Sequence, residues 1–233
     1  MTSLTSVAMT TFPASFASEE LLERVRANLD RIYDRIEASG RDRTSVRVVA
    51  VTKTFGIDEI RAALALGLTT VGENYVDELC EKRQAAMTLP LSWHYLGALQ
   101  SNKIARAASC AEVLCAVARD KELTRIASVA PGKLVDIQVD FTGQAQRNGA
   151  APQDVAGLVA RARALELKVR GLMVVAPPDE TAARAAFVKT NALANDLGVT
   201  ERSMGMSDDL ELACELGSTE VRLGRALFGS RVS

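Results

Sequence analysis

The most informative part of the sequence is Ser203-Met204-Gly205-Met206-Ser207-Asp208-Asp209, followed by Glu220-Val221-Arg222-Leu223-Gly224. Each segment is a turn of small residues at the end of an apolar run, and the first turn leads directly into a helical pattern that Gly217 closes. The order strand, turn, helix, strand is the repeating unit of a parallel sheet with crossover helices.

The same alternation extends upstream over most of the chain. Short apolar segments typical of strands alternate with segments whose apolar residues recur at helical spacing. The strand candidates are Val46–Lys53, Thr69–Glu73, Ser92–Gly97, Glu112–Val117, Leu134–Asp140, Val169–Ala176, about Arg202–Met206, and Val221–Phe228. The helical patterns are Ile57–Leu66, Tyr75–Ala86, Lys103–Ala108, Lys121–Val129, Gln153–Leu165, Thr181–Leu197 and Asp208–Leu216.

Eight such strands predict an α/β fold, a single (β/α)8 TIM barrel with an extra N-terminal helix. The 233 residues are close to the length of such a barrel, roughly 250. Ser18 is placed to cap the extra helix and Gly40 to end it, and its apolar stripe should pack across the outside or one end of the barrel. The alternative is an open doubly wound sheet, but no G-x-G-x-x-G follows the first strand.

Composition limits the classes of function. The net charge is −1, with 28 basic and 29 acidic residues well mixed, so neither a nucleic-acid nor a membrane surface is expected. The four cysteines, Cys80, Cys110, Cys115 and Cys214, form no C-x-x-C pair and are interpreted as small core residues of a reduced, cytoplasmic protein. The single histidine, His94, excludes multi-histidine metal sites, and we interpret it as a hydrogen-bonded core residue rather than a base.

No Pro/Gly-rich linker marks a second domain, so residues 19–233 are expected to form one barrel. Residues 1–18 contain no Lys, Arg, Asp or Glu, unlike a secretory signal or an organellar transit peptide. We expect a disordered tail there.

Three separate segments should meet at the carboxyl-terminal rim, where barrel active sites lie. Lys53 ends the first strand, which neighbours the eighth strand carrying Arg222 and Gly224, while Ser203–Ser207 ends the seventh. Asn74 follows the second strand at the same rim. A lysine amine opposite a turn and helix start that bind phosphate is the arrangement that pyridoxal phosphate (PLP) requires.

Two side-chain details accompany this prediction. Asp208 and Asp209 should cap the following helix and point away from the anion. Arg222 lies in a buried strand pattern and needs a partner, either a structural carboxylate or a ligand atom.

These residues and their surrounding segments resemble those of the pyridoxal phosphate homeostasis protein family. The matching segments are Val49–Lys53, Gly72–Glu78, Trp93–Gly97, Leu99–Lys103, Gly171–Met173, Ser203–Asp209, Val221–Gly224 and Phe228–Gly229. The resemblance implies a barrel like the N-terminal domain of alanine racemase and PLP held as a Schiff base on Lys53. It also implies a role in buffering or supplying PLP, with PLP-dependent apoenzymes as partners, rather than a reaction of its own.

The site residues implied in this way are Lys53, Asn74, Ser203, Met206, Ser207, Arg222, Gly224 and Arg225. Ser207, the Gly224 amide and the helix start hold the phosphate, and Arg222 faces the pyridine nitrogen. The chain departs from the family pattern at Ala98 (commonly histidine), Arg147 (commonly lysine) and Arg225 (commonly Thr or Ser). Arg225 can compensate for the lost hydroxyl if its side chain folds toward the phosphate.

Two other functions compete with this interpretation. The first is a PLP-dependent amino-acid racemase or related lyase, whose second base we expect to need a domain for which the chain has no room. The second is a barrel isomerase or aldolase acting on a phosphorylated sugar, with Lys53 as its reactive lysine. A monomer is expected.

Overall fold

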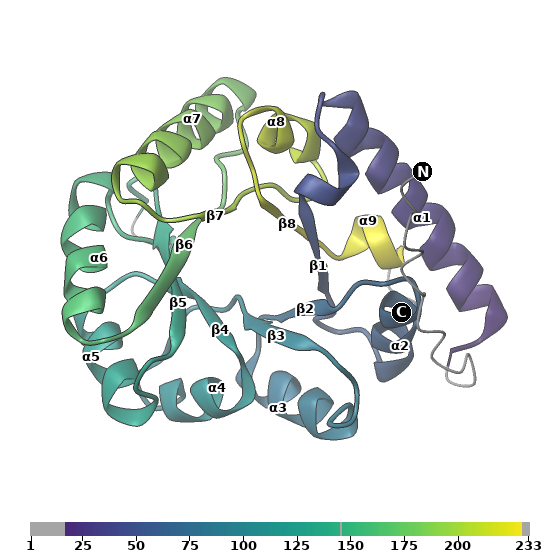
Figure 1. Ribbon diagram of the computed structural model, residues 1–233, viewed down its shortest axis with the longest axis horizontal. Helices are drawn as coiled ribbons and strands as arrows, with labels where there is room; N and C mark the ends of the chain where they lie inside the picture. Colours follow the sequence, from purple (N-terminus) through teal and green to yellow (C-terminus); the bar gives the residue numbers. More distant parts are fainter. Residues whose placement is uncertain (1–16, 145, 230–233) are drawn as a thin grey trace, which may run out of the picture.

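Eight parallel strands pair in chain order and close on themselves through β8 and β1 (Figure 1). The computed structural model describes residues 17–144 and 146–229. The strands are β1 (Arg47–Val51), β2 (Thr70–Glu73), β3 (Ser92–Tyr95), β4 (Val113–Val117), β5 (Leu134–Val139), β6 (Lys168–Val174), β7 (Glu201–Ser203) and β8 (Glu220–Leu223). Closure confirms the predicted (β/α)8 barrel and rules out the open doubly wound sheet.

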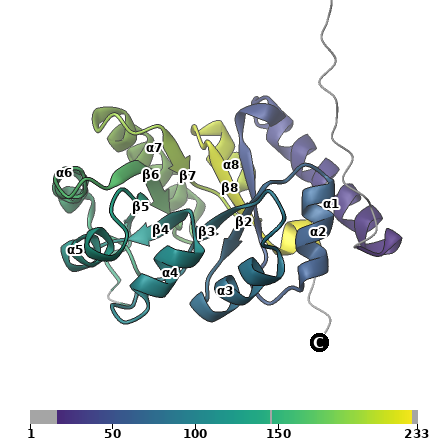
Figure 2. The same cartoon turned by 60° about the horizontal axis from the view of Figure 1, so that its bottom comes forward.

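Helices follow the strands and surround the barrel, as Figures 1 and 2 show. They are α1 (Glu19–Ala38), α2 (Ile57–Ala65), α3 (Val76–Ala85), α4 (Ile104–Cys110), α5 (Asp120–Val129), α6 (Val155–Ala164), α7 (Glu180–Asp196), α8 (Leu210–Glu215) and α9 (Arg225–Phe228), with 3-10 turns at Arg43–Ser45 and Pro152–Asp154. The main hydrophobic core lies between these helices and the outer face of the sheet.

The extra helix α1 forms as predicted. Ser18 accepts a hydrogen bond from the Leu21 amide at 3.2 Å, which satisfies one of the free N–H groups of the first turn. A stripe of five aliphatic side chains is buried: Leu21, Val25, Leu29, Ile32 and Ile36. Each contributes roughly 1.5–3 kcal/mol relative to an exposed position. The helix packs across the outside of the barrel against α2, α8 and α9.

The end of the eighth strand differs from the prediction, which extended it from Val221 to Phe228. β8 stops at Leu223, and residues 225–228 form the short helix α9. Leu227 and Phe228 are buried, with the Phe228 ring 5.0 Å from that of Phe55. An apolar run bounded by glycines satisfies both patterns, and packing against α1 favours the helix here.

The inside of the barrel has two layers. One is apolar, formed by Val49, Val51, Leu96, Val113, Cys115 and Met173, and it includes Val51, the last residue of β1, and Leu96, which follows β3. The other, toward the amino-terminal end, is ionic, because Arg170 pairs with both Asp136 and Glu220, and Arg47 also pairs with Glu220. A side chain at the boundary of the layers therefore has apolar neighbours on one side and fixed charges on the other.

The interpretation of all four cysteines as reduced core residues is wrong for two of them. Cys80 of α3 and Cys110 at the end of α4 are half-buried and joined by a disulfide. Thirty residues separate them in sequence, and consecutive helices packed side by side bring them together. Cys115 and Cys214 are buried free thiols, as expected.

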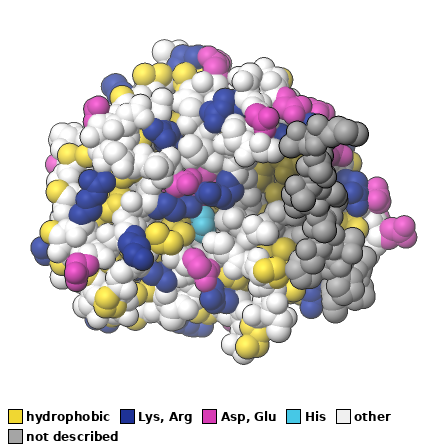
Figure 3. Space-filling model, in the orientation of Figure 1, with side chains coloured by type: hydrophobic (Ala, Val, Ile, Leu, Met, Phe, Trp, Pro, Cys, Tyr) yellow, Lys and Arg dark blue, Asp and Glu magenta, His cyan; other side chains and the backbone are white. Residues whose placement is uncertain are grey.

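The surface carries both charges. Figure 3 shows Lys and Arg side chains interspersed with Asp and Glu over one face. Within residues 17–144 and 146–229, no helix is long and apolar enough to cross a membrane. Apart from Ala17 and Ser18, the segment predicted as a disordered tail lies outside the described residues.

Candidate functional site

A cavity of about 310 Å³ opens at the carboxyl-terminal rim of the barrel. This volume falls at the lower end of the range for small-molecule sites, about 300–1,000 Å³. Seven of the eight predicted site residues line it: Lys53, Asn74, Met206, Ser207, Arg222, Gly224 and Arg225. Apolar side chains complete the walls, namely Val51, Phe55, Leu96, Met173 and Val175.

Lys53 enters the cavity because β1 points every second side chain inward. Val49 and Val51 face the barrel interior, and Lys53 continues the alternation two residues beyond the end of the strand. Within the described ranges its ammonium has neither a hydrogen bond nor an ion pair. It is therefore available to a ligand.

The turn that carries Lys53 is strained, and side chains of helix α3 hold it in place. Thr54 has φ +66°, a left-handed conformation that costs a β-branched residue about 1–3 kcal/mol. Its amide donates to Glu78 Oε1 at 2.5 Å. Lys82 Nζ reaches the same oxygen at 2.7 Å, and it also donates to the Thr52 carbonyl oxygen at 2.6 Å. Helix α3 thereby fixes the turn on both sides of Lys53.

A buried carboxylate completes this clamp. Lys82 Nζ lies 2.8 Å from Glu73 Oε1, and the Thr52 hydroxyl donates to the same atom at 2.5 Å. Burial raises the pKa of Glu73 above its ordinary value, against the opposing effect of Lys82. Lys82, Glu73 and Glu78 were not predicted as supports, since Glu78 and Lys82 alone look like an ordinary i,i+4 surface pair.

Gly97 allows Asn74 to take its place at the rim. A Cβ at Gly97 would lie 2.1 Å from the Asn74 carbonyl oxygen, so no larger residue fits without displacing that backbone. Gly224 serves a similar purpose on the other side, because a Cβ there would lie 3.1 Å from the Val51 carbonyl oxygen. The rim glycines thus let the end of β3 approach that of β2, and the end of β8 approach that of β1.

The turn predicted to bind phosphate leads into a helix that begins later than expected. Helix α8 begins at Leu210 rather than Asp208. The Asp209 carboxylate accepts a hydrogen bond from the Met206 amide at 2.6 Å, so this N–H group of the turn is already occupied. Asp208 lines the cavity 3.9 Å from the Arg225 guanidinium, which corrects the expectation that it points away.

Arg222 lies at the base of the cavity and is 5% exposed. Its Nη1 donates to the Ser203 carbonyl and hydroxyl oxygens at 2.6 and 2.8 Å, and its Nη2 donates to the Val174 carbonyl at 2.7 Å. Of the two partners considered for Arg222, a structural carboxylate and a ligand atom, no carboxylate contacts it directly among the described residues. Burial lowers the pKa of Arg222, and the nearby Glu220 carboxylate opposes that effect.

Ser203 does not line the cavity, unlike the other predicted site residues. It is fully buried behind Arg222 and donates from its hydroxyl to Glu220 Oε1 at 2.9 Å. His94 is a core residue, as predicted, with Nδ1 3.7 Å from the same oxygen. However, Nδ1 has no hydrogen bond within the described part of the chain, which corrects that detail. In Figure 3 the cyan imidazole is visible among charged side chains.

Comparisons with known proteins place this geometry in a family. The model of the alanine racemase N-terminal domain matches residues 21–232. A "pyridoxal phosphate homeostasis protein" of Pseudomonas aeruginosa is 39% identical over 220 residues, covering 91% of this chain and 96% of the relative. The chain belongs to the pyridoxal phosphate homeostasis protein family. The protein of the same name in Escherichia coli K12 is 32% identical over 223 residues, 88% of this chain and 95% of the relative.

Solved structures agree with this family membership. PipY of Synechococcus elongatus, described as having PLP bound, superposes with a TM-score of 0.75 at 33% identity, covering 85% of this chain and 100% of PipY. An alanine racemase of Clostridium difficile superposes with a TM-score of 0.74 at 16% identity. It is matched over 58% of its length and 91% of this chain, and at that identity it supports the fold alone.

Two departures from the family pattern lie outside the cavity. The Ala98 carbonyl accepts a hydrogen bond from the Tyr95 hydroxyl at 3.4 Å. Arg147 donates to the carbonyl oxygens of Val175 and Ala176 and lines an adjoining groove of about 720 Å³ between α7 and α8. The third departure, Arg225, lines the cavity itself.

Proposed function

We propose that this protein binds PLP in the 310 Å³ cavity, as a Schiff base on Lys53, and buffers it or supplies it to other proteins. The observation that carries the proposal is a lysine without a hydrogen bond or ion pair among the described residues, on a turn held by α3, that lines the same cavity as a buried arginine. The PLP-bound state of PipY and the names of the curated relatives support it.

The donor set fits the chemical parts of this cofactor. When bound, PLP supplies an aldehyde that condenses with a primary amine and releases one water molecule. Lys53 Nζ provides the amine, and Asn74 lies beside it at the rim. Ser207, the Gly224 amide and Arg225 hold the phosphate, with Met206 packed beside them. Arg222 faces the ring nitrogen as a cation, which disfavours a proton on that nitrogen and weakens the ring as an electron acceptor.

A carrier suits this site better than an amino-acid racemase or lyase. Racemisation requires a base on each face of the bound substrate. Among the described residues lining the cavity, Lys53 and Asp208 are the groups able to accept a proton. The Asp208 side chain is 92% exposed and lies near the Arg225 guanidinium, a poor setting for a second base. We therefore propose that the protein has no turnover of its own.

The first experiment locates the covalent site. Purified protein is mixed with PLP, reduced with borohydride and digested, and the modified peptide is identified by mass. We expect modification at Lys53 and none in Lys53→Ala, with Lys103→Ala as the matched control because Lys103 is exposed at the rim-side end of α4. A modified peptide lacking Lys53 contradicts the proposal. The absence of any adduct favours the sugar-phosphate isomerase or aldolase instead.

The second experiment tests catalysis. The protein loaded with PLP is incubated with L-alanine in deuterated water, and the α-proton and the configuration are followed. We expect no inversion. Exchange with inversion at an enzymatic rate, on the order of 1 per second or more, would make the protein a racemase. Slow exchange without inversion agrees with access by Lys53 from one face.

A further inference from the structure

The ionic layer beneath the cavity meets Arg222 through one hydroxyl group. Ser203 Oγ lies 2.8 Å from Arg222 Nη1 and 2.9 Å from Glu220 Oε1. A guanidinium only donates hydrogen bonds, so the single Ser203 proton is directed to Glu220 and the oxygen lone pairs to Arg222. The hydroxyl therefore has one orientation as long as Glu220 is an acceptor.

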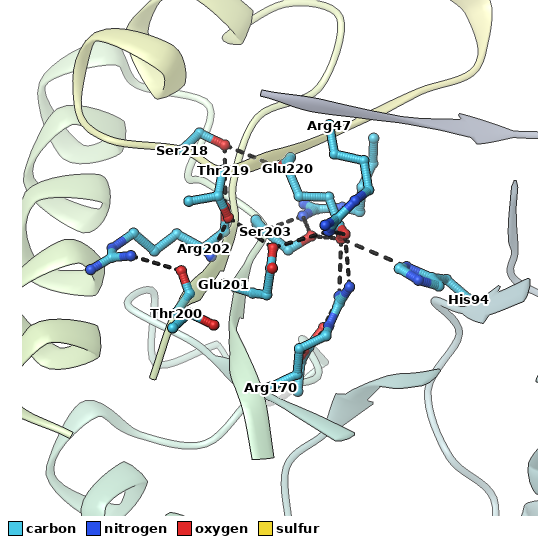
Figure 4. A network of polar contacts seen from close by, with 12 residues as sticks. Arg47, His94, Arg170, Thr200, Glu201, Arg202, Ser203, Ser218, Thr219 and Glu220 are labelled. Carbon is cyan, nitrogen blue, oxygen red and sulfur yellow. Dashed lines mark hydrogen bonds and ion pairs between the residues drawn. The ribbon is translucent and has the colours of Figure 1, made fainter. Parts of the chain in front are cut away.

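The surroundings of Glu220 keep its carboxylate a hydrogen-bond acceptor. It is fully buried, with Arg170 Nη1 3.0 Å and Arg47 Nη1 3.1 Å from its Oε2. Figure 4 shows Arg47, Arg170, Ser203 and His94 converging on its carboxylate. Although burial raises the pKa of Glu220, the neighbouring His94 and Arg170 hold it well below its ordinary value. The group is thus an anion at neutral pH.

Asp136 lies in the same ionic layer and provides a control for Glu220. Its side chain is also fully buried, and it pairs with Arg170 through Oδ2 at 2.6 Å and Oδ1 at 3.0 Å. It makes no hydrogen bond to Ser203 or Arg222 among the described residues. Replacing either carboxylate by its amide removes one buried charge next to Arg170, but only one of the two changes reaches Ser203.

From this geometry we infer that Glu220 is a positioning residue that acts through Ser203 to hold Arg222 against the base of the cavity. The inference rests on the proposed function, since Arg222 matters to the ligand only if the pyridine ring lies above it. Glu220 itself touches no ligand. It fixes the hydroxyl, and the hydroxyl, together with the Ser203 and Val174 carbonyl oxygens, keeps the guanidinium in one orientation toward the ring.

The test compares Glu220→Gln, Ser203→Ala, their double variant and Asp136→Asn in the intact protein. Affinities for PLP and for unphosphorylated pyridoxal are measured from the absorption band of the Lys53 adduct, and inorganic phosphate is titrated as a competitor. We expect Glu220→Gln to lower the affinities for PLP and for pyridoxal by the same factor, about 10-fold, and to shift the maximum of the absorption band. Competition by phosphate should not change, because Arg222 acts on the ring.

The double variant separates positioning from general damage. If Glu220 acts through Ser203, the double variant binds PLP no more weakly than Ser203→Ala alone, which is non-additive. Asp136→Asn should lower the melting temperature of the ligand-free protein comparably while leaving affinity and band maximum unchanged. Additive losses, or an equal loss of affinity in Asp136→Asn, overturn the inference. Ser203→Ala with wild-type affinity also overturns it, even if Glu220→Gln does not fold.

Failure of this inference is distinguishable from failure of the proposed function. If wild-type protein forms no adduct with PLP, or forms it away from Lys53, the proposed function fails and takes the inference with it. If the wild type forms the Lys53 adduct and Glu220→Gln behaves like Asp136→Asn, the inference alone is wrong.

Discussion

Arg35 of α1 donates a hydrogen bond from Nη2 to the Ser207 carbonyl oxygen at 2.9 Å, so the helix outside the barrel holds the turn at the rim of the cavity. The same Nη2 lies 2.6 Å from Glu211 Oε2 in α8. These contacts join α1, the turn and α8 into one unit. The extra helix thus has a role at the site as well as in the core.

Replacing Arg35 by Met should weaken PLP binding without touching the cavity. Losing the bond to Ser207 frees the turn, and a charge-assisted hydrogen bond contributes about 1.5–3 kcal/mol. We expect a loss of affinity of roughly 10-fold, measured by titrating the adduct band. Arg31→Met is the matched control, because Arg31 lies on the same helix and bonds only Asn28 in the described structure. Equal effects of the two changes would show that α1 does not act on the turn.

The clamp from α3 should control the reactivity of Lys53. Glu78→Gln weakens the contacts to the Thr54 amide and to Lys82, so the strained turn relaxes. We expect the Lys53 adduct to form more slowly and PLP to bind more weakly. Stopped-flow absorbance measures both.

Lys82→Met is the severer variant of this clamp. It leaves Glu73 buried without its cation, which is expected to cost about 3–5 kcal/mol of stability. Glu81→Gln on the same helix is the control. An unchanged rate of adduct formation in Glu78→Gln would contradict the role of the clamp.

Several features of this site were predictable from sequence because they depend on local sequence patterns. Lys53 follows an apolar strand whose alternation determines the direction of its side chain, and Gly205 near Ser207 marks a turn. In contrast, the place of Ser203 behind Arg222 depends on the pairing of β7 with β8, where Ser203 stands opposite Glu220. Such a register is a tertiary property, and no local pattern contains it.

The same distinction explains the errors. The apolar run that ends at Phe228 suits a strand or a helix, and contact with α1 decides between them. Asp208 looked like a helix cap because the sequence places it before an apolar pattern, but the helix begins two residues later. Likewise, the pairing of Cys80 with Cys110 follows from the packing of α3 on α4.

The disulfide can be tested by counting thiols. Protein unfolded without reductant should expose two reactive thiols, Cys115 and Cys214, and four after reduction. For a loop of this length, with a separation of 30 residues, the cross-link should stabilise the fold by about 2–4 kcal/mol. Cys80→Ser should therefore lower the midpoint of urea unfolding, and Cys115→Ser should leave the thiol pairing unchanged. Four reactive thiols in unreduced protein would contradict the pairing.

The phosphate should dominate selection of the ligand. Ser207, the Gly224 backbone and Arg225 surround one end of the cavity, and charge-assisted hydrogen bonds contribute about 1.5–3 kcal/mol each. We expect unphosphorylated pyridoxal to bind at least 100-fold more weakly than PLP, measured from the adduct band. Similar affinities would refute the phosphate site even if Lys53 proved to be the covalent site.

Asp208 and Arg225 provide an opposed pair for the same measurement. Their side chains lie 3.9 Å apart at the cavity, so a bound phosphate competes with the Asp208 carboxylate for the guanidinium. Asp208→Asn should therefore strengthen PLP binding and Arg225→Ser should weaken it, each by about 2- to 5-fold because both groups are largely exposed. Neither change should affect pyridoxal, which carries no phosphate, and raising the ionic strength should diminish both effects. If Arg225→Ser weakens the binding of pyridoxal as much as that of PLP, Arg225 acts on the ring or the fold rather than on the phosphate.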